Sequence, residues 1–509
     1  MPRAIGPLPQ CARKVSVAKC DIENRANSDA CGIRKESKDN MRFGPTISRR
    51  CLLGGTISAV ALGNPLRTKS AAVHAFPASF VWGASTSSYQ IEGAVDEDGR
   101  GKSIWDLFSH AVGRIKNGDT GDVACDHYHR WREDLEFISR CGFGACRFST
   151  SWPRILPTGS GTIERRGLDF YDRLVDGLIA RGIAPWLCLY HWDLPQALQD
   201  QGGWLNRDIV QKFAEYARIV ARRLGDRVKH WAVLNEPNVH ALFGHGIGSH
   251  APGLTGLPHM LAAIHHQNLA QGVALQALRA ERSALILGTV LSLQPARPSS
   301  DRDEDYRAAE RFDAMWNGTC LDPLLRGSYP SSVADDFTPL IMEGDLVTTR
   351  QRIDYLGVNY YNPMYIVHDP QSLFGAWFGA RPPNMPSTAM DWPIDAAGLT
   401  EGLIRLRDRY GNPDVYVTEN GACFNDSLAA DGTVSDVDRI DYLRAHLAAA
   451  QDALAAGVKL RGYFVWSLLD NFEWQEGYSR RFGVIYVDFK TLKRTPKASY
   501  QWLAKLIKG

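Results

Sequence analysis

The 509-residue chain lacks the features that define several large classes of protein. No apolar run reaches the roughly 18 residues that span a bilayer. Neither histidine pair, His127 with His129 or His265 with His266, forms a zinc-binding HExxH motif. No glycine-rich dinucleotide fingerprint follows the first expected strand. We therefore expect no transmembrane segment, no metal and no cofactor.

Charge is unevenly distributed along the chain. Residues 1–75 contain 13 lysines and arginines against 5 aspartates and glutamates, whereas residues 76–509 contain 45 against 51. A weakly acidic segment offers no basic stripe for nucleic acid, so we expect an uncharged small molecule as the partner. The six cysteines of residues 76–509 are too few for a disulfide framework.

The first 75 residues resemble a twin-arginine export signal. Arg49 and Arg50 are adjacent, a weakly hydrophobic run too short to span a membrane covers residues 54–62, and small residues precede Phe76. A basic segment, a modest apolar middle and a small-residue cleavage site are the three parts of such a signal. We expect a periplasmic or secreted protein, or a cytoplasmic one if the signal does not function.

Two details of this leader leave alternatives open. Leu52 and Gly54 stand where the signal's consensus prefers phenylalanine and lysine, and a disordered basic tail would have a similar composition. Residues 1–40 show no hydrophobic period, so we predict Met41 as the true start of translation.

Residues 76–509 alternate short apolar runs with longer stretches of helical period and contain no linker. Runs that are apolar on both faces are typical of buried parallel strands, and apolar residues at i, i+3 and i+4 indicate helices. Eight such units favour one (β/α)8 TIM-barrel domain over an open doubly wound sheet. The expected strands cover residues 80–84, 145–149, 185–191, 231–236, 285–293, 355–361, 415–419 and 462–467, and helices are expected within 126–141, 165–181, 207–224 and 399–410.

Two glutamates end expected strands, Glu236 in Asn-Glu-Pro and Glu419 in Thr-Glu-Asn-Gly. A carboxylate at the carboxyl end of a barrel strand is typical of an active site, because a charge in the middle of the core would be costly. Either glutamate alone could simply terminate a strand or lie in a surface turn. Together they suggest the acid and the nucleophile that cleave a glycosidic bond with retention, which requires carboxyl groups about 5 to 5.5 Å apart.

Both motifs and their neighbours resemble glycoside hydrolase family 1, the retaining β-glycosidases, over nearly the whole chain after residue 75. The resemblance implies that Glu236 is the acid/base and that Glu419 is the nucleophile of a two-step reaction. It also implies that Arg147 and Tyr361 keep Glu419 anionic, while Glu236 begins the reaction protonated.

The same resemblance implies how the sugar is bound. Gln90 and His191 would bind hydroxyls of the non-reducing sugar, since an amide or an imidazole can satisfy a hydroxyl pair. Glu473 would hold the 4- and 6-hydroxyls, and as an anion it would repel a phosphate, so neutral sugars are favoured. The full set of expected substrate-binding residues is Gln90, His191, Trp192, Asn235, Asn359, Trp392, Trp466, Glu473, Trp474 and Phe482.

The sequence departs from the family pattern at two places. Val233 stands where the family usually has threonine, and Pro393 follows Trp392, the expected aglycone-stacking residue, where the family usually has an acidic residue. The proline-rich stretch 367–391 breaks both periods, so we expect a long loop there that borders the aglycone end of the site.

The expected function is that of a retaining exo-β-glycosidase acting on terminal non-reducing β-D-glucosyl residues, with β-galactosyl and β-fucosyl residues as further candidates. A catalytically silent sugar-binding barrel is an alternative, but such a protein would normally lack one carboxyl. A thioglucosidase is another, but plant enzymes of that kind carry glutamine at the position of Glu236.

Overall fold

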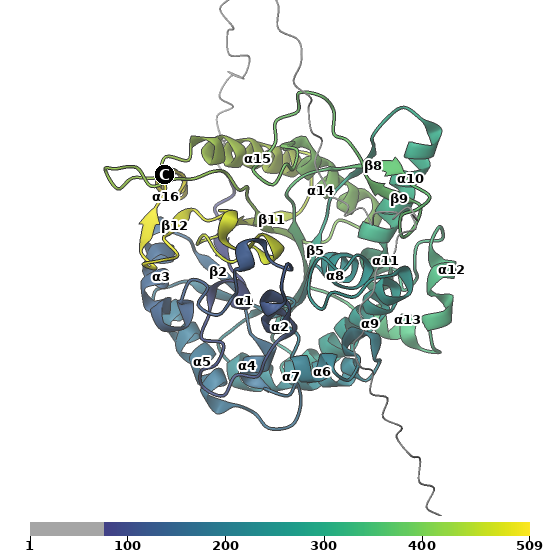
Figure 1. Ribbon diagram of the computed structural model, residues 1–509, viewed down its shortest axis with the longest axis horizontal. Coiled ribbons are helices and arrows are strands. Elements are labelled where there is room, and N and C mark those ends of the chain that lie inside the picture. The colour runs from purple at the N-terminus through teal and green to yellow at the C-terminus, as the bar shows by residue number, and fades with distance from the viewer. Residues whose placement is uncertain (1–75) are drawn as a thin grey trace, which may run out of the picture. The chain divides into compact units, whose positions relative to one another are not determined.

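The computed structural model describes residues 76–509, and the predictions of an export signal and of a start at Met41 lie outside the described residues. Within the described part, eight parallel strands close into a barrel surrounded by helices, which confirms the predicted (β/α)8 TIM barrel (Figure 1). Neighbouring strands follow the order β1-β11-β10-β7-β5-β4-β3-β2. They are β1 Val81–Ser85, β2 Ala145–Ser149, β3 Ala184–Tyr190, β4 His230–Asn235, β5 Ile286–Ser292, β7 Tyr355–Asn359, β10 Val415–Asn420 and β11 Leu460–Trp466, each within two residues of an expected run.

The helices form a layer outside the barrel. In α7 the residues Phe213, Ala217 and Val220 are buried, and their spacing of three and four places them on the face that packs against the strands. Gly142 ends α3 with a φ of 92°, a left-handed conformation that glycine adopts without strain. The longer helices are α3 His127–Cys141, α5 Arg165–Ile179, α7 Ile209–Leu224, α9 Leu257–Glu281, α10 Asp303–Asp313, α11 Thr319–Leu325, α14 Ala397–Tyr410, α15 Val437–Ala455 and α16 Ala498–Lys508.

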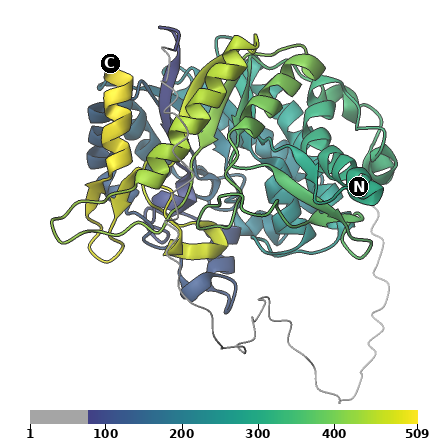
Figure 2. The same ribbon diagram turned by 90° about the horizontal axis from the view of Figure 1, so that it is seen from above.

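Short helices lie in the connections. They are α1 Ser88–Ile91, α2 Ile104–His110, α4 Trp152–Ile155, α6 Gln196–Gln199, α8 Pro237–Ala241, α12 Ala334–Phe337 and α13 Asp345–Thr349, with further turns of 3-10 or π helix at η1 Lys116–Gly118, η2 Gly203–Leu205, η3 Leu242–Gly246, η4 Ala314–Gly318, η5 Thr338–Leu340 and η6 Trp474–Ser479. The last helix, α16, lies beside α3 in the outer layer (Figure 2). Tyr500 donates a hydrogen bond to the carbonyl of Phe137 at 2.7 Å across this contact.

The interior of the barrel is filled in layers at the amino ends of the strands. Trp186 stacks on His230 with ring centroids 4.0 Å apart and packs edge-on against Tyr355. Gly83 is required beside this layer, because a Cβ atom there would lie 2.2 Å from the ring of Phe464. Because aromatic side chains fill the barrel at the amino ends of the strands, a site can form only at their carboxyl ends.

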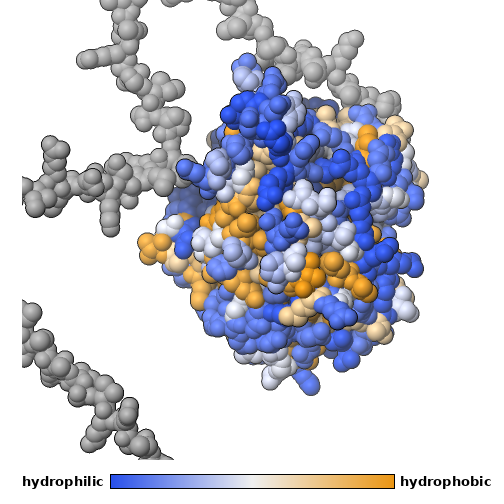
Figure 3. All heavy atoms as spheres, turned by 90° about the vertical axis from the view of Figure 1, so that its right-hand side faces the viewer, coloured by the Kyte–Doolittle hydropathy of each residue, from blue (hydrophilic) through white to orange (hydrophobic). Residues whose placement is uncertain are grey.

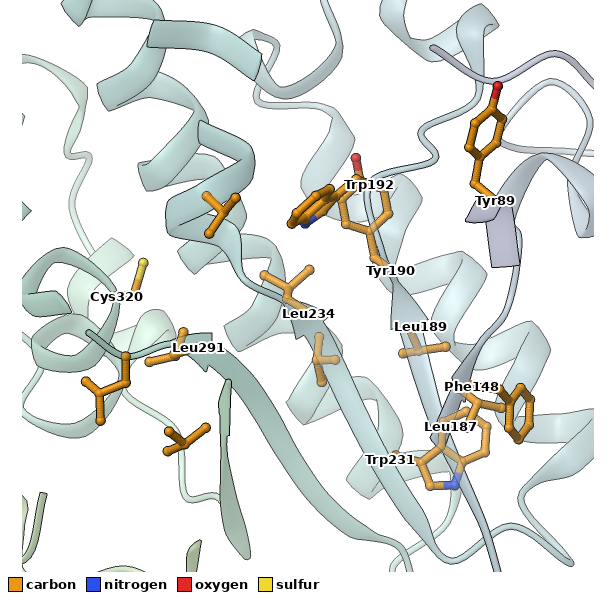
Figure 4. Packing of buried hydrophobic residues seen from close by; sticks show 14 of the residues in the cluster. Tyr89, Phe148, Leu187, Leu189, Tyr190, Trp192, Trp231, Leu234, Leu291 and Cys320 are labelled. Atoms are coloured by element: carbon orange, nitrogen blue, oxygen red, sulfur yellow. The ribbon is translucent and has the colours of Figure 1, made fainter. Parts of the chain in front are cut away.

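A second, larger core lies between the strands and the helices. Alternate residues of β3 and β4, including Leu187, Leu189 and Trp231, belong to it (Figure 4). Val233, which stands where the family usually has threonine, is fully buried in the same core. Its side chain therefore packs against the helical layer and does not line the site.

Two small sheets lie outside the barrel. One contains β6 Ala296–Pro298, β8 Met364–His368 and β9 Ala376–Phe378, and the other pairs β12 Ile485–Val487 with β13 Arg494–Pro496. The expectation of a long loop over residues 367–391 was therefore wrong for its first part, which contains the end of β8 and all of β9. These strands are too short, and too closely followed by glycine and proline, to produce a readable period.

Several whole-domain properties follow from the described residues. Within residues 76–509, no helix is long and apolar enough to cross a membrane, and no cluster of histidine, cysteine or acidic side chains could hold a metal ion. The six cysteines of this segment are unpaired and buried, and burial raises the pKa of Cys146 to about 12. The face in Figure 3 is mostly hydrophilic with scattered apolar patches, as expected for a folded domain.

Candidate active site

The carboxyl ends of the barrel strands open into a cavity of about 790 Å³. Glu236 reaches it from the end of β4 and Glu419 from β10, so the fold brings the two glutamates to one cavity. Other residues expected from the sequence that line it are His191, Trp192, Tyr361, Trp392, Trp466, Glu473, Trp474 and Phe482. The remaining expected residues, Gln90, Arg147, Asn235 and Asn359, are fully buried behind this lining and hydrogen-bond to it.

Glu236 is held in place by an unusual backbone conformation. It has a φ of 46°, a left-handed value that is uncommon for any residue other than glycine, and its N–H donates to the carbonyl of Val290 at 2.8 Å. Asn359 donates to its carboxyl at 3.0 Å. Burial raises the pKa of Glu236 to about 8, and the negative charge of Glu419 adds to the rise. The carboxyl is therefore protonated at neutral pH.

Glu419 has a different set of partners. Arg147, in the middle of β2, contacts one carboxyl oxygen at 2.5 Å, and the hydroxyl of Tyr361 donates to the other at 2.7 Å. Burial raises the pKa of Glu419, but Arg147 and Tyr361 oppose that rise because they stabilise the ionised form. Since Arg147 bonds Glu419 and not Glu236, we assign the shared proton to Glu236 and the negative charge to Glu419.

A network of side chains joins the two glutamates to the sugar-binding wall. Asn235 accepts from Arg147 at 2.6 Å and from Asn359 at 3.1 Å, and its amide nitrogen faces Nε2 of His191 at 3.0 Å. Because the amide nitrogen can only donate, Nε2 of His191 is the acceptor and Nδ1 carries the proton. Burial lowers the pKa of His191 well below its ordinary value, and Nδ1 has no hydrogen-bond partner among the described residues, so it can donate to a ligand.

Glu473 lies on the wall next to the indole of Trp474. Gln90 donates to its carboxyl at 3.4 Å and to the carbonyl of Phe472 at 3.0 Å, so Gln90 orients the wall from behind. Burial and the nearby charge of Glu419 raise the pKa of Glu473 to about 8. A raised pKa weakens the repulsion of a phosphate that was expected from an ionised Glu473.

A different feature still favours an uncharged ligand. Arg381 is the one cation among the cavity-lining residues of the described chain, and it pairs with Asp391 at 2.7 Å. Glu476, which also lines the cavity, pairs with Lys116 at 3.1 Å and with Arg480 at 3.0 Å. A phosphate would have to break one of these pairs to find a partner.

The outer part of the cavity was largely missed by the sequence analysis. Its walls come from connections after β4, β5 and β7 and include Phe243, His250, Gln294, Trp316 and Phe378. The expected loop does border the cavity, through residues 378–384 and 390–391. These residues carry no motif, but Gln294 follows the fifth expected strand, so the rule that located the glutamates could have found it.

A closed eight-stranded barrel with two buried carboxyl groups in one cavity is the arrangement of the (β/α)8 glycoside hydrolases. The chain belongs to one family of them: the sequence profile described as "Glycosyl hydrolase family 1" matches residues 72–509.

Curated relatives and solved structures agree with this membership. "Beta-glucosidase A" of Thermotoga maritima is 47% identical over 86% of this chain and 98% of its own, and "Bifunctional beta-D-glucosidase/beta-D-fucosidase" of Bifidobacterium breve is 45% identical over 85% and 98%. The structure of the family 1 β-glucosidase from Thermotoga maritima matches with a TM-score of 0.83 and 46% identity, over 85% of this chain and 98% of that one. A complex of the Thermotoga enzyme with castanospermine matches with a TM-score of 0.82 at the same identity and coverage.

Proposed function

We propose that this protein is a retaining exo-β-glycosidase that hydrolyses terminal non-reducing β-D-glucosyl residues, with β-fucosyl and β-galactosyl residues as further substrates. The observation that carries the proposal is the pair Glu236 and Glu419 in one cavity, with a cation bonded to only one of them. Relatives named as β-glucosidases and as a β-glucosidase/β-fucosidase support the choice of sugar.

In the first step, Glu419 attacks the anomeric carbon and forms a covalent glycosyl ester, while the bond to the leaving oxygen breaks. Glu236 gives that oxygen its proton, so the aglycone leaves as a neutral alcohol. In the second step, Glu236 takes a proton from water, the water oxygen attacks the anomeric carbon, and Glu419 is released as a carboxylate. Two inversions give net retention.

The remaining side chains bind and orient the sugar. His191, Glu473 and the indoles of Trp466 and Trp474 contact its hydroxyls and ring faces, and Phe482 and Trp192 complete the pocket. The family resemblance supports a contact between Asn235 and the 2-hydroxyl, where a hydrogen bond strengthens in the transition state, although Asn235 is buried behind the residues that line the cavity. Behind them, Gln90 and Asn359 fix the positions of Glu473 and Glu236 through the hydrogen bonds described above.

The test is hydrolysis of 4-nitrophenyl β-glucoside, followed by proton NMR of the released sugar. Rapid appearance of β-glucose before mutarotation is the expected result. Release of α-glucose would contradict retention, and sugar binding without turnover would favour a silent binding barrel. A parallel assay with a thioglucoside should show much slower turnover, because protonation by Glu236 speeds the departure of an oxygen leaving group, whereas a weakly basic sulfur gains little from it.

For residues 1–75 we propose export by the twin-arginine route, with translation starting at Met41 and a periplasmic or secreted product. The support is the sequence: adjacent Arg49 and Arg50, a short apolar run and a basic balance of charge. Replacing both arginines with lysine should keep the protein in the cytoplasm. Mapping the amino terminus of the native protein tests the start, and a peptide from residues 1–40 in cell extract would exclude Met41.

A further inference from the structure

Gln294 is a buried polar residue that the mechanism above does not use. It lies two residues beyond the end of β5, lines the cavity and is 6% exposed. Its side-chain oxygen is buried and has no hydrogen-bond partner among residues 76–509. Buried amides without partners are rare because each costs a lost hydrogen bond, so this one requires an explanation.

The backbone of Gln294 is held far more firmly than its side chain. Asn317, in η4, donates to the carbonyl of Gln294 at 2.9 Å and accepts from its N–H at 3.4 Å. Asn317 also donates to Asp313 at 2.8 Å, and Asp313 is paired with Arg405. The chain of contacts fixes the point from which the side chain extends and leaves the amide free for a ligand.

The position of Gln294 relative to the acid/base identifies the part of a substrate that it faces. Ser292, the last residue of β5, is close enough to Glu236 to lower its pKa, and Glu236 protonates the leaving oxygen. Gln294 lies two residues beyond the end of this strand and lines the cavity together with residues of the connections after β4 and β7. It faces the leaving group and not the sugar that becomes attached to Glu419.

Flat aromatic side chains line the same cavity as Gln294. The indole of Trp316 is fixed by a hydrogen bond to the carbonyl of Ser292 at 3.0 Å, and Phe243 packs on it with centroids 6.2 Å apart. Phe243 and Phe378 are nearly parallel, with an interplanar angle of 9°. An apolar wall beside one free amide suits a neutral ring that has apolar faces and hydroxyl edges, which describes a second sugar.

We propose that Gln294 determines the preference for the leaving group, by hydrogen-bonding a hydroxyl of the second sugar in a β-linked glucose disaccharide. This inference rests on the proposed β-glucosidase function and adds a substrate class to it. An aryl leaving group stacks on the same walls but has no hydroxyl for the amide.

The test compares kcat/KM for cellobiose and for 4-nitrophenyl β-glucoside in Gln294→Met, which keeps the volume and removes the amide. We expect kcat/KM for cellobiose to fall about tenfold, the effect of one lost hydrogen bond, and the value for the nitrophenyl substrate to stay within about twofold. Gln199→Met is the matched control, because Gln199 also has a buried side-chain oxygen without a partner but does not line the cavity. It should change neither value.

Each other outcome has a definite meaning. An unchanged ratio of the two kcat/KM values in Gln294→Met, or an equal fall in both, overturns the role of Gln294. Failure of the wild-type protein to hydrolyse the nitrophenyl substrate overturns the proposed function itself. Thermal unfolding shows whether Gln294→Met is folded, and Gln294→Ala, assayed in the same way, replaces it if it is not.

Discussion

The inner and outer halves of the cavity are built in different ways. The inner half, around Glu236, Glu419 and His191, consists of polar side chains at the strand ends, each tied to a neighbour by at least one hydrogen bond. The outer half, around Phe243 and Trp392, consists of rings from loops and short helices that mainly pack against other rings. Bond cleavage requires groups held to fractions of an ångström, whereas binding a leaving group requires a shaped surface.

The two halves also differ in electrostatics. In the inner half, burial raises the pKa values of Glu236 and Glu473 to about 8, so both carboxyl groups gain or lose a proton within the range of pH just above neutrality. In the outer half, Arg381 and Asp391 form a partly exposed ion pair that adds little binding energy. Substitutions in the inner half should therefore change the chemical step, and those in the outer half should change binding.

The largest effect is expected for Glu419→Ala. Loss of the nucleophile should reduce kcat by roughly 10⁵-fold or more, because no other group can form the glycosyl ester. Added azide should restore part of the turnover and give an α-glycosyl azide, identified by NMR. A β-glycosyl azide would assign the nucleophile to another residue. The inner half of the cavity could then no longer be described as the part that carries out the chemical step.

Glu236→Ala should have a smaller effect that depends on the leaving group. For cellobiose we expect a loss of roughly 10³-fold, the usual contribution of a general acid, and a much smaller loss for an activated dinitrophenyl glucoside. Azide should here give the β product. In the wild-type protein kcat/KM should fall above about pH 8, because the acid must carry its proton and loses it as the pH rises through its pKa. Equal losses on both substrates would contradict the acid role.

Tyr361→Phe should move one limb of the pH profile. The hydroxyl of Tyr361 stabilises ionised Glu419, so its removal raises the pKa of Glu419 further. Because the nucleophile must be ionised, the acid limb of kcat/KM should move to higher pH, so activity should fall most on the acid side of the profile. Tyr365→Phe is the control: Tyr365 lines the cavity without bonding either glutamate. An acid limb that stays in place would show that Tyr361 acts only through packing.

The difference between the halves also explains what the sequence could predict. Glu236, Glu419 and His191 stand at or next to the ends of apolar strands, so the strand pattern indicates where they lie. Glu473 lies in the segment after β11, and only the family resemblance predicted its place in the site. The pKa of Glu473 was not predictable, because it depends on how completely neighbouring loops bury the carboxyl.

The outer half follows no such rule. Phe243 lies in a π-helical turn and Phe378 in a three-residue strand, both set by tertiary packing and not by a local period. The hydrogen bonds between Asn317 and Gln294 join a helical turn to a strand end, and neither segment alone indicates the contact. Pattern reading therefore located the reacting groups and missed most of the surface that selects the leaving group.

The smallest effect is expected for Trp392→Ala, which tests whether the outer half acts only in binding. Its ring contacts Phe482 and Tyr361 with centroids 5.9 and 5.5 Å apart, and loss of a stacking surface worth about 1 kcal/mol should raise KM for 4-nitrophenyl β-glucoside roughly fivefold. Trp377→Ala is the matched control, because Trp377, in β9, does not line the cavity. A fall in kcat comparable to the rise in KM would mean that Trp392 also positions Tyr361, and the two halves would then be coupled through that ring.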